Sequence, residues 1–164
     1  MSTHLLLALA LAAAPAASAA SPASQPATEP APIDTVRLQS ELQRAEKATY
    51  SGRAREARTI YRKLLDEQRN AGEYARQTLW NLAMHYLYQE DPGNAAVTLD
   101  ELAKQANQFG DPTTELRATF EAAVLWTKAR RPAYASERAQ RIRDLMKSPV
   151  IAESDKAEYR RRMV

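Results

Sequence analysis

The sequence predicts an all-α fold, and three observations lead to this prediction. Beyond residue 34, glycine and proline occur almost only at regularly spaced positions, and both residues interrupt helices. The segments between them are rich in Ala, Leu, Arg, Glu, Gln and Lys, which are good helix formers. Within each segment the apolar residues recur every three or four positions, and no long segment alternates as a strand would. We therefore expect an all-α domain over residues 34–164.

Residues 1–19 precede this domain and have the pattern of a secretory signal peptide. Positions 5–14 contain only Leu and Ala, and positions 17–19 (Ala-Ser-Ala) offer the small residues that a signal peptidase requires. We expect cleavage near Ala19-Ala20 and export to the periplasm or the extracellular space. The alternative is an uncleaved membrane anchor, but the apolar run is shorter than the roughly 20 residues that a membrane span needs.

Residues 20–33 are expected to form a disordered tether between the signal peptide and the helical domain. They are mainly Ala, Ser, Pro, Thr and Gln, a composition that cannot bury a core and that favours extended backbone. No second apolar run of comparable length follows. We therefore expect no transmembrane span in the mature chain.

Glycine and proline divide the helical domain into segments of nearly constant length. The breaks fall at Gly52, Gly72, Pro92 with Gly93, Pro112 with Gly110, Pro132 and Pro149. Segments of this length accommodate helices of about 15–18 residues joined by short turns. At one boundary the sequence also predicts a helix start, because Asp111 can cap the first turn and Pro112 suits the first helical position.

Each segment in turn places its apolar residues on one side of a helix. In chain order these stripes are Leu38, Leu42, Ala45 and Thr49; Ala54, Ala57, Ile60, Tyr61, Leu64 and Leu65; Leu79, Leu82, Ala83, Tyr86 and Leu87; Ala95, Leu99, Leu102, Ala106 and Phe109; Leu116, Thr119, Phe120, Ala123 and Trp126; and Ala135, Ala139, Ile142 and Met146. Their spacing follows the helical period, with the first stripe the weakest. Six amphipathic helices are thus expected before the last proline.

Pairs of small residues indicate an internal repeat. The pairs are Ala45 with Ala57, Ala83 with Ala95, and Ala123 with Ala135, so the two members lie twelve positions apart and the pairs recur after 38 and 40 residues. A small residue where two antiparallel helices cross allows the backbones to approach closely. We expect three helix–turn–helix units, at about 34–71, 73–109 and 112–147, and a C-terminal capping helix within 150–164.

The middle unit resembles the tetratricopeptide repeat (TPR) family. Residues 79–86 (LWNLAMHY) are similar to the first-helix signature, with Leu79 where Trp is usual, and Ala95 with Leu99 resemble the second-helix signature. The other two units match in part, so the resemblance covers about 34–147. It implies a right-handed superhelical array of about three antiparallel helix hairpins. The period near 40 departs from the family's 34 residues, and a plain helical bundle is the alternative.

The resemblance also implies a binding groove, because the first helices of TPR hairpins line a concave surface. It places these residues on or near the groove: Gln39, Glu46, Gln77, Trp80, Met84, Tyr88, Arg117, Phe120 and Lys128. Aromatic side chains such as Trp80, Tyr88 and Phe120 could anchor a peptide or a helix of another protein. Trp80 and Phe120 could instead belong to the core between units. The function that the resemblance implies is protein–protein interaction.

The C-terminal part of the chain suggests an alternative partner, because residues 128–164 contain eleven basic and five acidic side chains. The candidate basic patch consists of Arg138, Arg141, Arg160, Arg161 and Arg162. Such a patch could attract anionic lipid head groups or cell-wall polymers of the envelope. A solvated face of mixed charge is the structural alternative. The export signal argues against nucleic acid as the partner.

The composition disfavours enzymatic chemistry. The chain has no Cys and four Gly, which excludes thiolate metal sites, a Cys nucleophile and glycine-rich phosphate loops. His85 is the sole histidine after the signal peptide, and no serine lies in a nucleophile elbow beside which it could act. Acidic pairs such as Asp100-Glu101 are sequence neighbours, which do not face each other on a helix. We expect a non-enzymatic protein with no cofactor and no metal site.

Overall fold

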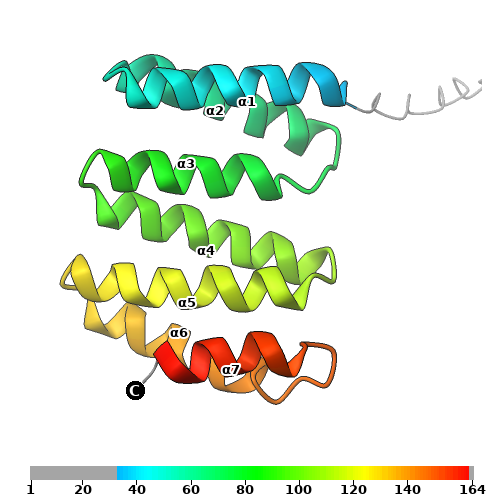
Figure 1. The fold of residues 1–164 in the computed structure, drawn as a ribbon, viewed down its shortest axis with the longest axis vertical. Helices are drawn as coiled ribbons and strands as arrows, with labels where there is room; N and C mark the ends of the chain where they lie inside the picture. Colours follow the sequence, from blue (N-terminus) through cyan, green and yellow to red (C-terminus); the bar gives the residue numbers. More distant parts are fainter. Residues whose placement is uncertain (1–32, 163–164) are drawn as a thin grey trace, which may run out of the picture.

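The computed structural model describes residues 33–162, which fold into seven helices and contain no β-strand (Figure 1). The helices are α1 (Thr35–Tyr50), α2 (Ala54–Asn70), α3 (Arg76–Tyr88), α4 (Pro92–Gln108), α5 (Pro112–Lys128), α6 (Pro132–Leu145) and α7 (Glu153–Arg162). The predicted all-α class is therefore confirmed. The expected signal peptide and almost all of the expected tether lie outside the described residues. Within 33–162, no helix combines the length and apolar character needed to cross a membrane.

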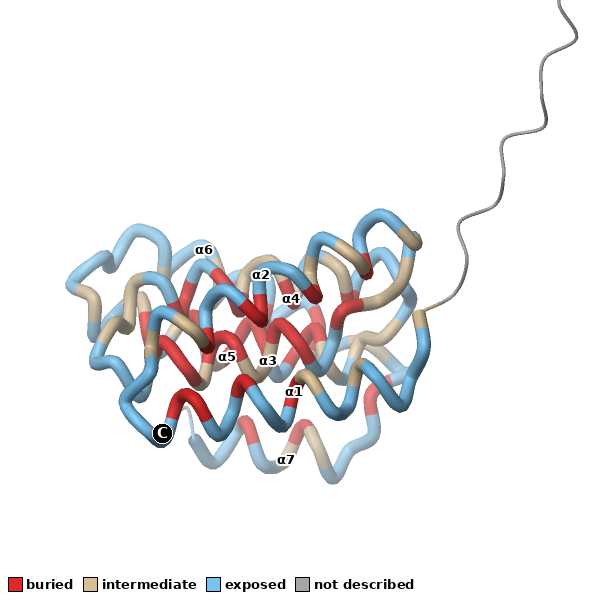
Figure 2. The backbone as a smooth tube through the Cα atoms, turned by 90° about the horizontal axis from the view of Figure 1, so that it is seen from above, coloured by how far each residue is buried: buried red, intermediate tan, exposed pale blue. Residues whose placement is uncertain are grey.

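The helices are stacked in chain order along the long axis, with α1 and α2 at one end and α6 and α7 at the other (Figure 1). From α1 to α6, each helix packs against the next. A view along the stack separates two layers, which we call the odd layer (α1, α3, α5, α7) and the even layer (α2, α4, α6) (Figure 2). This extended stack differs from a closed bundle, because its two ends lie far apart. The TPR identity and the right-handed superhelix stay predictions.

Two side-chain contacts show how neighbouring helices of the odd layer are aligned. The Gln39 Nε2 amide donates to Gln77 Oε1 at 2.9 Å. Near the other end of the same helices, the rings of Tyr50 and Tyr88 meet edge to face with centroids 5.4 Å apart. Both contacts join residues 38 positions apart in the sequence. Helices α1 and α3 therefore run parallel. Residues 38 positions apart, which is the spacing between the first two alanine pairs, lie next to each other in the two helices.

Five helices, α1 to α5, end in the same kind of turn. The residue after each C-cap has a left-handed backbone, and these residues are Gly52, Gly72, Glu90, Gly110 and Arg130. The next amide then bonds to a carbonyl five residues earlier, as Arg53 N does to Ala48 O at 2.9 Å. This hydrogen bond defines a Schellman motif, which satisfies carbonyls that the helix end leaves unpaired. Gly93, which the sequence placed at a boundary, lies inside the first turn of α4.

Helices α4 and α5 begin with the same Asp-Pro pair. The Asp91 carboxylate accepts a hydrogen bond from Asn94 N, and the Asp111 carboxylate accepts one from Thr114 N, each at 3.0 Å. Proline occupies the first helical position in both helices, where no backbone donor is needed. The predicted cap at Asp111 is confirmed. Helix α6 begins with Arg131 in the cap position, and no side chain of the described part of the chain caps it.

The core follows the stack and consists of two clusters. The first is built from buried side chains of α1 to α5, including Ala45, Ala57, Ala83 and Ala95, each with no exposed surface. The second lies at the C-terminal end of the stack, between α5, α6 and α7, and comprises Leu116, Phe120, Ile142, Leu145, Ile151 and Tyr159. Helix α7 covers this second cluster through Tyr159, so it has the position expected of a capping helix.

Candidate binding face

The odd layer carries two neighbouring hollows, and Trp80 lines both of them. The α1–α3 hollow has a volume of about 550 Å³ and is lined by Glu46, Thr49, Tyr50, Tyr61, Trp80, Asn81, Met84, His85, Leu87 and Tyr88. The α3–α5 hollow has a volume of about 400 Å³ and is lined by Arg76, Gln77, Trp80, Leu102, Thr113, Thr114 and Arg117. Helices α1 and α7 lie farther from the even layer than α3 and α5 do (Figure 2). The odd layer is thus recessed along its middle helices.

Exposed aromatic rings and one carboxylate form the rim of the α1–α3 hollow. Tyr50 and Tyr88 are 64% and 54% exposed, although their rings contact each other. Glu46 lies one turn before Tyr50 on α1 and is also exposed. Among the described residues that line this hollow, Glu46 is the only acidic one and none is Lys or Arg. The rim therefore combines electron-rich ring faces with a single negative charge.

A buried histidine belongs to the inner wall of this hollow. His85 is 1% exposed, and Thr49 and Tyr61, which line the hollow with it, are also buried. The Thr49 hydroxyl donates to Ala45 O at 3.0 Å, so its oxygen is left to accept a hydrogen bond from His85 Nδ1, 2.9 Å away. This assignment places the imidazole proton on Nδ1 and leaves Nε2 as a bare acceptor. Burial, aided by the charge of Arg58, lowers the pKa of His85 and favours the neutral ring.

The Nε2 atom of His85 is buried and has no hydrogen-bond partner among residues 33–162. Buried polar atoms are nearly always paired in folded proteins, because an unpaired one loses its hydration without compensation. The hollow therefore contains one side chain whose hydrogen-bonding capacity the described part of the protein leaves unused.

The α3–α5 hollow has the opposite charge. The Arg117 guanidinium lies over the Trp80 ring, with its central carbon 4.0 Å from the ring centroid, which is a cation–π contact. Arg76 also lines this hollow and approaches Asp111 at 3.7 Å. Thr113 and Thr114 add hydroxyl groups from the first turn of α5. Trp80 thus separates a rim with one carboxylate from a hollow with two guanidinium groups.

Most residues predicted for the groove line these two hollows. Glu46, Met84 and Tyr88 line the first, Gln77 and Arg117 line the second, and Trp80 lines both. The three helices that supply them come together because α1, α3 and α5 are neighbours in the odd layer.

The other three predicted groove residues lie elsewhere. Gln39 lines a separate hollow of α1, and Lys128 is exposed at the end of α5 without lining either of the two hollows. Phe120 is 5% exposed, which agrees with the alternative that it belongs to the core. The ring packs against Tyr159 of α7 with centroids 5.0 Å apart, and the Arg162 guanidinium covers it at 4.5 Å. Helix α7 therefore makes Phe120 a core residue.

The structure also adds residues that the sequence did not assign to the site. Tyr50, Thr49, Tyr61 and Arg76 all line the hollows. The repeat spacing could have indicated Tyr50, because it lies 38 positions before Tyr88, which was assigned to the groove. Thr49 and Tyr61 carried no such signal, because their places on apolar stripes identify them only as core.

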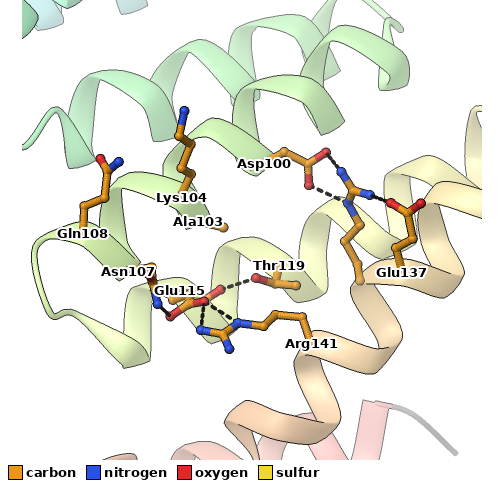
Figure 3. Close-up of a pocket in the computed structure, with 10 residues that line it drawn as sticks. Asp100, Ala103, Lys104, Asn107, Gln108, Glu115, Thr119, Glu137 and Arg141 are labelled. Atoms are coloured by element: carbon orange, nitrogen blue, oxygen red, sulfur yellow. Dashed lines mark hydrogen bonds and ion pairs between the residues drawn. The ribbon is translucent and has the colours of Figure 1, made fainter.

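The predicted basic patch is divided between two helices. Arg138 and Arg141 lie on α6 and line a hollow of about 560 Å³ between α4, α5 and α6, where Arg141 points towards Glu115 (Figure 3). Arg138 donates to the Asp100 carboxylate through two nitrogens at 2.9 and 2.8 Å, and Arg141 Nε donates to Glu115 at 2.7 Å. Glu115 is almost fully buried and also accepts from Asn107 at 3.1 Å. These bonds connect α4, α5 and α6, which gives both arginines a structural role.

The remaining arginines of the patch lie on α7 in the odd layer. Arg160 pairs with Glu153 at 3.2 Å, and Arg162 pairs with Glu121 of α5 at 2.7 Å. Arg161 is exposed. Four of the five patch residues are therefore paired with carboxylates.

No cluster of three or more His, Asp or Glu side chains within 33–162 is placed to hold a metal ion. Comparison of the chain with models of protein families, with curated proteins and with solved structures finds no significant match. The candidate site consequently rests on the geometry of the odd layer.

Proposed function

We propose that this chain is an exported, non-enzymatic helical-repeat protein of TPR-like type, which binds another protein in the periplasm or cell envelope. The observation that carries the proposal is the pair of hollows that meet at Trp80 on the recessed odd layer. They extend across three helices, a span that suits an extended segment or a helix of a partner.

The kinds of side chain in the hollows support a protein as the ligand. Tyr, Trp and Arg dominate the binding energy of protein interfaces, because they bury large surfaces and also form directed polar contacts. Tyr50 and Tyr88 are exposed, and Arg117 is exposed beside Trp80. These groups are presented by rigid helices, so little conformational entropy is lost when they bind.

A pull-down tests the proposal. The full chain, immobilised, is incubated with an extract of the producing cell's envelope, and bound proteins are identified by mass spectrometry. We expect a partner that is lost when Trp80→Ala, Tyr88→Ala and Arg117→Ala are combined. Because Trp80 contacts the core, a second variant with only the two exposed side chains changed guards against unfolding.

The matched control carries three changes on exposed even-layer positions, Arg62→Ala, Val97→Ala and Gln140→Ala. We expect this control to retain the partner and all variants to keep the wild-type circular dichroism spectrum. A partner that binds the odd-layer variants as strongly as it binds the control would contradict binding in the hollows.

Export is tested separately by N-terminal sequencing of the protein recovered from the periplasm or medium of an expressing bacterium. We expect a chain that begins at Ala20. Recovery of the uncleaved chain in the membrane fraction would contradict the proposed export and favour the anchor.

The alternative of an anionic envelope surface as ligand stays a prediction of the sequence. Four arginines of the predicted patch are paired with carboxylates: Arg138, Arg141, Arg160 and Arg162. This pairing gives no specific support to an anionic ligand. It predicts binding to anionic vesicles that falls steeply with ionic strength.

A further inference from the structure

The α1–α3 hollow combines a buried acceptor with an acidic, aromatic rim. His85 Nε2 can accept one hydrogen bond, and no described residue supplies it. A ligand group that satisfies Nε2 must therefore be a hydrogen-bond donor. Because Nδ1 holds the ring proton, a carboxylate or carbonyl of a ligand would meet a lone pair and be repelled.

The rim favours a donor with a positive charge. Among residues 33–162, Glu46 is the only carboxylate that lines the hollow, and no Lys or Arg of this range lines it. The rings of Tyr50 and Tyr88 are exposed and electron-rich, and such rings attract cations. Acceptor, carboxylate and rings thus favour the same kind of ligand group.

The neighbouring hollow helps to decide where that cation binds. Arg76 and Arg117 line the α3–α5 hollow and would repel a positive group there. A cationic side chain of a ligand lying across Trp80 is therefore directed to the α1–α3 side. An acidic neighbour in the same ligand would be attracted to the α3–α5 side.

We propose that the α1–α3 hollow receives an arginine side chain of the bound protein segment, between the His85 acceptor and the Glu46 carboxylate. This inference rests on the proposed function and gives the chemistry of its ligand. A planar guanidinium has five donors, so it can bond to two acceptors at once and also stack on a ring. The protein already pairs these groups within itself, where Arg117 lies over Trp80.

The test uses the full chain labelled with ¹⁵N and three small probes: N-acetylarginine amide, its lysine counterpart and its uncharged citrulline counterpart. Binding is followed through the imidazole nitrogen resonances. The sequence has two histidines, so a His4→Ala variant identifies the signals of His85. We expect the arginine probe to shift the Nε2 resonance saturably and the citrulline probe to bind at least tenfold more weakly, roughly the contribution of one charge-assisted hydrogen bond.

Two variants of α1 provide the matched comparison. Glu46→Gln removes the carboxylate of the rim, and Glu41→Gln removes a carboxylate of the same helix that pairs with Arg44 at 3.6 Å and does not line the hollow. We expect about a tenfold loss of arginine-probe affinity for Glu46→Gln and wild-type affinity for Glu41→Gln. Both side chains are at least partly exposed, so neither change disturbs the core.

The inference is overturned if the citrulline or lysine probe binds as tightly as the arginine probe. It is also overturned if the two variants behave alike or if the Nε2 resonance does not move. These results are separable from the pull-down. If the partner is lost when Tyr88 and Arg117 are changed but His85 does not respond to the arginine probe, the proposed function stands and arginine is not the ligand group. If His85 responds to the probe but no protein binds the odd layer, the hollow binds arginine and the proposed function is contradicted.

Discussion

Glu90 and Arg130 occupy equivalent positions in two turns that lie forty residues apart, and both have a left-handed backbone with φ of 56°. Glycine holds this position in the three other turns of the same kind. The Schellman geometry requires the left-handed residue, because only then do the following amides reach back to the last helical carbonyls. A side chain with a Cβ is disfavoured in this conformation by roughly 1–2 kcal/mol.

Glu90→Gly and Arg130→Gly should therefore each stabilise the protein. Removal of the strain outweighs the larger backbone entropy that glycine loses on folding, which leaves a net gain of about 0.5–1 kcal/mol in the free energy of unfolding. Urea denaturation monitored by circular dichroism measures the change.

Gly52→Ala is the reciprocal control for these turns. Its φ is +73°, and an added Cβ would meet no atom of the described residues within 4 Å, so any loss of stability comes from the backbone alone. We expect a loss of about 1 kcal/mol. Stability that is unchanged by this substitution would contradict the assigned strain.

The start of α6 should accept a new helix cap. Arg131 precedes Pro132 as Asp91 precedes Pro92, but only the aspartate caps its helix. Arg131→Asp is expected to raise the free energy of unfolding by about 1 kcal/mol, and Asp91→Ala to lower it by a similar amount. Thermal and urea unfolding of both variants checks the pair. Equal effects of Arg131→Asp and Arg131→Ala would show that the loss of the positive charge, rather than the cap, is responsible.

His85 should make stability depend on pH. Burial and Arg58 lower its pKa in the folded chain below the ordinary value of 6.5, so the unfolded chain takes up its proton first as the pH falls. The contribution of His85 is complete above pH 6.5 and declines as the pH drops from there towards the folded pKa. Urea midpoints measured from about pH 7.5 to 5 should fall in the wild type and in His4→Gln. The decline should be smaller in His85→Gln, and an identical decline in both variants would contradict the assignment.

Asp100 should contribute more to stability than an exposed aspartate. Its carboxylate accepts from Arg138 and from Trp126 Nε1, the latter at 2.8 Å, and is only 22% exposed. Asp100→Asn weakens both bonds, and we expect a loss of about 2 kcal/mol in the free energy of unfolding. The control is Asp66→Asn, whose partner is Arg69 in a pair that is 69% and 67% exposed, and whose effect should stay below about 0.5 kcal/mol. Equal losses for the two substitutions would remove the special role of Asp100.

The sequence by itself determined the helices and most of their ends. Helix formation depends on residues close in the chain, so proline at the start of α4, α5 and α6 and the cap at Asp111 could be read directly. Pro92 located the turn at Glu90 in the sequence. The left-handed backbone of Glu90 itself could not be predicted, because glutamate gives no local signal for that conformation.

Only the tertiary structure decided which side chains meet. Thr49 and His85 lie 36 positions apart, and their hydrogen bond exists because α1 and α3 pack side by side. Phe120 has the same apolar character as a groove residue, yet it is buried because α7 folds over it. Helical period and composition describe each helix alone, whereas burial and the pairing of polar atoms depend on what packs against it.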